Sequence, residues 1–108
     1  MQQNFSIKRG DTSPAIQFAL APASVNLVLA DVQFQMRPRG GGDTVIDAPA
    51  LVVSETPPVV GYAWQAADTE TAGWYEAEFR VTYFDGTVET FPNAAFINVF
   101  INGDVADL

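Results

Sequence analysis

Hydrophobic and polar residues alternate along most of this chain, with the period of two that is typical of half-buried β-strands. The segment FSIKR (5 to 9) alternates in this way, and AIQFALAP (15 to 22) and DVQFQMRP (31 to 38) repeat the pattern. Successive side chains of a strand point to opposite faces of a sheet. Each of these segments is therefore predicted to be a strand with one buried and one solvated face.

The second half of the chain carries the longest alternating stretch. VVGYAWQA (59 to 66) predicts one strand, and TAGWYEAEFRVTYFDGTVETFP (71 to 92) predicts two strands joined by a tight turn. On the first of these two strands, the inward side chains are expected to be Tyr75, Ala77, Phe79, Val81 and Tyr83, and the outward side chains Trp74, Glu76, Glu78, Arg80 and Thr82.

The turn between these two strands is expected at Asp85 and Gly86. An Asp-Gly pair between alternating strands is a strong signal for a type I′ hairpin, in which Phe84 would pair with Thr87. Val88 would then face inward, whereas the apolar set that follows, Ala95, Ile97, Val99 and Ile101, has odd numbers. We therefore expect one extra residue, a β-bulge, near Pro92 and Asn93.

The remaining segments predict turns and edge strands. RGGGD (39 to 43) predicts a hairpin loop, and TVIDAPALVVSETPP (44 to 58) predicts short edge strands because Pro49 interrupts it. No long helical period occurs. The chain is therefore predicted to be an all-β sandwich of about seven to nine strands, forming a single domain over residues 1 to 108.

Composition narrows the function classes. The 108 residues include no cysteine and no histidine, which removes disulfides, the commonest general base and the usual zinc ligand. A net charge of −8 disfavours binding to nucleic acid. Neither a signal peptide nor a membrane-spanning apolar run is present, so we expect synthesis in a reducing cytoplasm and no membrane partner.

The stretch AGWYEA (72 to 77) resembles the corner before the second cysteine of immunoglobulin domains. Tyr75 stands at the position of the tyrosine corner, where the hydroxyl bonds the backbone, and Ala77 stands at the position of the cysteine. This resemblance implies an immunoglobulin-like sandwich that packs without a disulfide.

Three longer blocks, IKRGDTSPAIQFAL, VNLVLADVQFQMRP and TAGWYEAEFRVTYFDGTVETFPN, are similar to the immunoglobulin-like amino-terminal domain of phage baseplate upper proteins and related tail proteins. The resemblance implies a tailed-phage virion structural protein, an adaptor or accessory subunit of the tail that binds other virion proteins and can form a homo-oligomer. The alternatives are a capsid or neck decoration protein, or a carbohydrate-binding module that uses Tyr62, Trp64 and Trp74.

No reaction chemistry is predicted. Without His or Cys there is no common activated nucleophile, and Glu76 and Glu78 fit the solvated face of a strand better than a glycosidase pair. The RGD triplet at Arg9 is read as a turn. We expect no enzyme activity, no cofactor and no metal.

Three aromatic side chains are the candidate functional residues. Trp74, Phe96 and Phe100 fall on the outward parity of strands whose inward positions are already apolar. Aromatic residues are enriched in protein interfaces, so these three predict a docking surface. The alternative is that a loop or the opposite edge of the sheet covers them.

Overall fold

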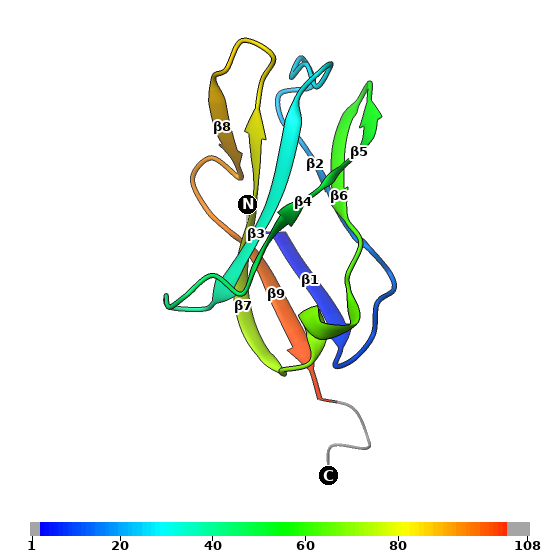
Figure 1. Cartoon of the computed structure of the whole chain (residues 1–108), viewed down its shortest axis with the longest axis vertical. Coiled ribbons are helices and arrows are strands. Elements are labelled where there is room, and N and C mark those ends of the chain that lie inside the picture. The colour runs from blue at the N-terminus through cyan, green and yellow to red at the C-terminus, as the bar shows by residue number, and fades with distance from the viewer. Residues whose placement is uncertain (1–2, 104–108) are drawn as a thin grey trace.

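The structure is a computed structural model that describes residues 3–103, and in this part of the chain the regular elements are β-strands and one short 3₁₀ helix (Figure 1). The strands are β1 (Gln3–Lys8), β2 (Ile16–Ala19), β3 (Asp31–Pro38), β4 (Ile46–Pro49), β5 (Leu51–Glu55), β6 (Pro58–Tyr62), β7 (Gly73–Thr82), β8 (Val88–Phe91) and β9 (Ile97–Asn102). One short 3₁₀ helix, η1 (Ala66–Thr69), precedes β7.

The strands form two sheets. A six-stranded sheet has the order β1-β9-β7-β3-β4, with β8 also paired to β7, and a three-stranded sheet has the order β2-β6-β5. Among the strands of residues 3–103, β1 and β9 pair in parallel, and the other pairs are antiparallel. The predicted all-β, immunoglobulin-like sandwich is confirmed, and the expected edge strands after residue 44 are β4 and β5, on different sheets.

The core lies between the sheets and is centred on Phe34 of β3. Its ring stacks on Tyr62 with centroids 4.6 Å apart, and lies 5.0 Å from the ring of Phe79 and 5.6 Å from that of Trp64. Aromatic contacts at these distances add to the hydrophobic gain from burial. The inward parities predicted for β2, β3, β6 and β7 are confirmed by the buried side chains Ile16, Leu20, Val32, Phe34, Met36, Val60, Tyr62, Trp64, Tyr75, Ala77, Phe79 and Val81.

Hydrogen bonds from two tyrosine hydroxyls fix the chain at the corner before β7. The Tyr75 hydroxyl donates to the Thr71 carbonyl oxygen at 2.7 Å, which confirms the tyrosine corner. The Tyr62 hydroxyl donates to Asp68 at 2.6 Å, and the same carboxylate oxygen accepts the backbone N–H of Gln65 at 2.8 Å. Burial and, for Tyr62, the Asp68 carboxylate raise the pKa of both phenols.

The hairpin after β7 differs from the predicted type I′ turn. Tyr83 and Thr87 close it, with the Tyr83 N–H donating to the Thr87 oxygen at 2.8 Å, so that the loop has three residues. Gly86 has a φ of 89°, whereas Asp85 is not among the residues with positive φ. The Asp85 carboxylate instead accepts from the backbone N–H and the hydroxyl of Thr87, at 3.0 and 2.6 Å, and stabilises this longer loop.

The three-residue loop also removes the need for the predicted bulge at Pro92 and Asn93. Val88 pairs with Thr82, so Val88 faces outward and is 48% exposed, while Phe91 is buried opposite Phe79. Inward parity is odd on β7, β8 and β9 alike. From Phe91 to Ile97 the chain advances by six positions, while their partners on β7 go back by two, from Phe79 to Ala77. The connection between β8 and β9 therefore has four extra residues, an even number that keeps the parity.

Candidate functional site

The three predicted interface residues lie on the outer face of the six-stranded sheet, away from the core. Trp74 of β7 and Phe100 of β9 are cross-strand partners, and their rings stack with centroids 4.2 Å apart. Trp74 is 48% exposed, so no loop covers it. Phe96, directly before β9, and Phe100 are half-buried.

Two arginine side chains complete this surface, and the sequence did not point to them. The guanidinium of Arg39 lies 5.3 Å from the centroid of the Trp74 ring, and that of Arg37 lies 5.1 Å from the centroid of Phe96. Both separations fall within the range of a cation–π interaction. We define the aromatic–arginine face as Arg37, Arg39, Trp74, Glu76, Phe96 and Phe100.

Strand register explains why these side chains meet. Arg37 of β3 pairs with Glu76 of β7, and its Nε donates to Glu76 Oε1 at 3.1 Å. The next row follows β3 past its last residue, where the Arg39 N–H donates to the Trp74 carbonyl oxygen at 2.9 Å. The outward parity of Arg37 was visible in the sequence, but its partner across the sheet depends on a pairing between residues far apart in the chain.

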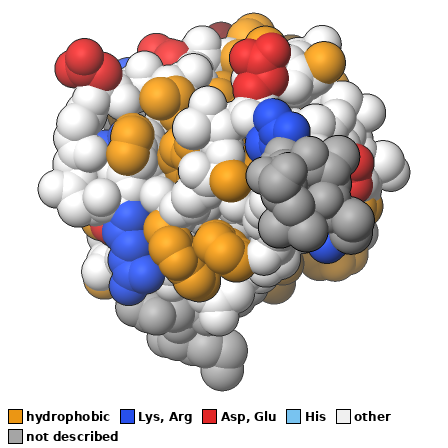
Figure 2. Space-filling view, turned by 90° about the horizontal axis from the view of Figure 1, so that it is seen from below, with side chains coloured by type: hydrophobic (Ala, Val, Ile, Leu, Met, Phe, Trp, Pro, Cys, Tyr) orange, Lys and Arg blue, Asp and Glu red, His pale blue; other side chains and the backbone are white. Residues whose placement is uncertain are grey.

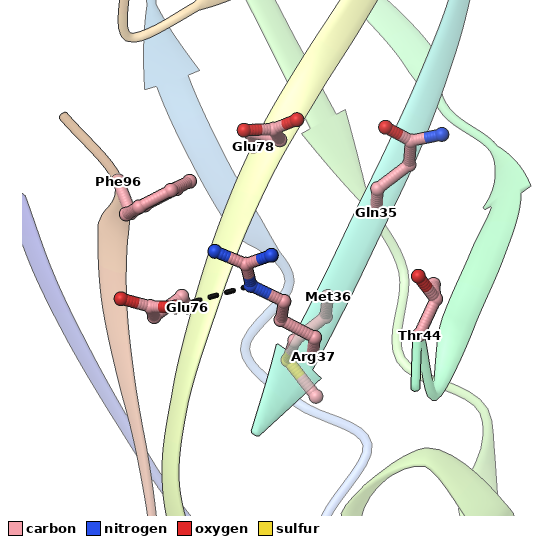
Figure 3. A pocket seen from close by; sticks show the side chains of 7 residues that line it. All are labelled: Gln35, Met36, Arg37, Thr44, Glu76, Glu78 and Phe96. Atoms are coloured by element: carbon pink, nitrogen blue, oxygen red, sulfur yellow. Dashed lines mark hydrogen bonds and ion pairs between the residues drawn. The ribbon is translucent and has the colours of Figure 1, made fainter. Parts of the chain in front are cut away.

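A hollow of about 170 Å³ opens on the same face (Figure 3). It is shallow, and Glu76 on its wall is engaged by Arg37. Pockets that enclose small ligands usually measure ~300 to 1,000 Å³. The hollow therefore suits one protruding side chain of a larger partner better than a small molecule. Its lining residues are Gln35, Met36, Arg37, Thr44, Glu76, Glu78 and Phe96.

Figure 2 looks at the end of the molecule at the bottom of Figure 1, where β1 and β9 end and β7 begins. Hydrophobic and basic side chains lie next to each other on this surface (Figure 2). Only five of the 108 residues are Lys or Arg, and two of them contact aromatic rings on this one face. The face therefore differs in chemistry from the acidic surface expected of a chain with a net charge of −8.

Residues 3–103 also bear on metal binding and on membrane insertion. In this part of the chain no group of three or more His, Cys, Asp or Glu side chains could hold a metal ion. No helix formed by these residues is long and apolar enough to cross a membrane.

Comparisons with known proteins identify the fold. No protein-family model matches the chain, and no curated protein matches it. Among solved structures it is similar to CopC from Methylosinus trichosporium OB3b, with a TM-score of 0.54 and 12% sequence identity over 94% of this chain and 86% of that one. At this identity the likeness shows a shared fold alone.

This match contradicts the predicted function as a tailed-phage structural protein, together with its decoration and carbohydrate-binding alternatives. The sandwich is similar to that of CopC, and nothing in the comparisons points to a tail protein. The physical reason is that the blocks carrying the resemblance contain β2, β3 and the hairpin of β7 and β8, whose inward residues build the core. Core residues specify a fold, and one fold serves many functions. The family resemblance, the virion location and the virion partners stay predictions.

Proposed function

We propose that this chain is a non-catalytic protein-binding module that docks through the aromatic–arginine face. The observation that carries the proposal is the Trp74–Phe100 stack, which lies on the solvent side of the sheet with Arg39 over its exposed ring. Trp, Phe and Arg are enriched at protein interfaces, and Trp and Arg are the commonest residues of binding hot spots.

The arrangement of the face favours a protein over other partners. Strand β7 and its neighbours hold the aromatic rings in place through backbone pairing, so little conformational entropy is lost on docking. The guanidinium groups of the two arginines lie near aromatic rings, and a guanidinium has five N–H donors that a partner can use. A net charge of −8 would repel a phosphate backbone.

Site-specific photocrosslinking in the cells that naturally express the protein tests this function. Phe100→p-benzoylphenylalanine should give a defined covalent adduct, whereas the same change at Gln17, exposed on β2 of the other sheet, should give none. Adding Trp74→Ser should lower the yield from position 100 by roughly tenfold, because a central aromatic anchor is lost. Equal adducts from both positions, or none from position 100, would reject this docking face.

A further inference from the structure

We propose that the occupant of the aromatic–arginine face is a second copy of this chain. The inference rests on the proposed function and names its partner. The first argument is charge. On this face, β3, β7 and Arg39 directly after β3 present three cations, Arg37, Arg39 and Arg80, and three anions, Asp31, Glu76 and Glu78. These charges sum to zero on a chain with a net charge of −8. Two copies repel each other least where their surfaces are locally neutral.

The second argument is the order of side chains across the sheet. One row runs from Arg37 through Glu76 to Asn98, and the next row runs from Arg39 through Trp74 to Phe100. In each row the cation lies on the β3 side and its partner, a carboxylate or an indole ring, lies on β7. Two copies of such a row are complementary when the strand order of one copy is reversed, because each cation then lies opposite a carboxylate or an indole ring of the other copy.

A twofold axis parallel to the strands, midway between β3 and β7, produces this reversal. It sets β7 of one copy over β3 of the other, so that Glu76 faces Arg37 of the second copy and Trp74 faces Arg39 of the second copy. Both contacts occur twice, as in any isologous interface. An axis across the strands would instead set Arg37 over Arg37 of the second copy, which like charges disfavour.

Apolar side chains also match in this arrangement. Val45, directly before β4, is 54% exposed and lies at the β4 end of the Arg37 row, where its N–H donates to the Met36 oxygen at 2.8 Å. The same twofold axis carries it toward Asn98 of the second copy, between Phe96 and Phe100. An exposed valine would then be buried between two half-exposed rings.

Sedimentation equilibrium of the full chain tests the proposal, from about 1 µM to about 1 mM so that weak association is measured. We expect a monomer–dimer equilibrium at physiological salt. Arg37→Glu and Glu76→Arg should each weaken it by roughly tenfold or more, because each places like charges opposite one another. An equimolar mixture of the two variants should dimerise again, since the carboxylate introduced at position 37 of one chain then faces the guanidinium introduced at position 76 of the other.

A matched control separates this contact from a general effect of charge. Glu55→Arg on the other sheet changes the net charge by the same amount as Glu76→Arg, and it should not change dimerisation by more than about twofold. Trp74→Ser in both members of the mixture should abolish its association. Melting curves confirm that each variant is folded.

Two results would overturn the proposal. A dimer that none of the face variants weakens would use another surface. A chain that stays monomeric at about 1 mM has no such dimer. In that second case the docking function survives if position 100 still gives a specific photocrosslink in cells, whereas loss of that crosslink as well would reject both.

Discussion

The two faces of β7 share one backbone and differ in what their residues determine. Inward, Phe79 and Val81 are completely buried in the core between the two sheets. Outward, Trp74 and Glu76 contact two arginines of the β3 segment. The inward face specifies a β-sandwich, and one fold can serve many functions. The outward face is not constrained by the core, and its aromatic stack is therefore the better indicator of function.

Truncating the inward face should have the largest effect. Phe79 is fully buried against Phe34 and Phe18, so Phe79→Ala should lower the free energy of unfolding by about 3 to 5 kcal/mol. Urea titration measures this loss. The adjacent outward change, Arg80→Ala, should cost less than about 0.5 kcal/mol. Similar costs at the two positions would mean that the two faces do not differ as described.

The inward face was also the part that could be predicted from the sequence. Alternation at Val60, Tyr62 and Trp64, and again along β7, fixes which side chains are buried without any knowledge of the partner strands. The tyrosine corner was predictable too, because Tyr75 and Thr71 are only four residues apart. The alternation of apolar and polar residues, and hydrogen bonds between residues close together in the chain, can be predicted from a sequence alone.

Tyr75→Phe tests that corner and should have the second largest effect. The change removes the hydrogen bond to the Thr71 carbonyl oxygen and leaves that oxygen without its partner, at a cost of about 1 to 3 kcal/mol. Denaturant midpoints measure it, and a reducing agent should change nothing because the chain has no cysteine. Equal midpoints for Tyr75→Phe and the parent would show that the corner does not stabilise the fold.

Long-range pairing explains what the sequence could not predict. The parallel pairing of β1 with β9 joins residues at opposite ends of the chain, and the contact of Arg37 with Phe96 depends on β3, β7 and β9 lying side by side. The predicted type I′ turn at Asp85 was wrong for a different reason. Asp-Gly is compatible with both a two-residue and a three-residue loop, and the bonds from Thr87 to Asp85 favour the longer one.

Changing the outward face should lower the free energy of unfolding only slightly and weaken self-association strongly. Phe100→Ser removes the stack on Trp74, so we expect a loss of about 0.5 to 1.5 kcal/mol in unfolding free energy. The proposed self-association should weaken by roughly tenfold or more in the same variant. Phe84→Ser is the matched control, because Phe84 is 78% exposed at the hairpin tip and belongs neither to the core nor to the aromatic–arginine face. A collapse of the melting temperature in Phe100→Ser would place this ring in the core.

The smallest effect should come from pH near neutrality, and it distinguishes the tyrosines held by carboxylates from the rest of the surface. The chain has no histidine, so stability should be almost constant between about pH 6 and pH 9.

Burial, together with the hydrogen bond that the Tyr83 hydroxyl donates to Glu89 at 2.7 Å, raises the pKa of Tyr83 from 10.0 to about 12. A phenol whose pKa is raised by folding contributes stability that is complete below the unfolded pKa of about 10 and is lost as the pH rises through its folded value. Urea midpoints should therefore begin to fall only above about pH 10, and Tyr83→Phe should reduce that alkaline loss without moving the neutral plateau. Phenolate absorbance from Tyr83 at pH 10 in the folded chain would show that its hydroxyl is not held by Glu89.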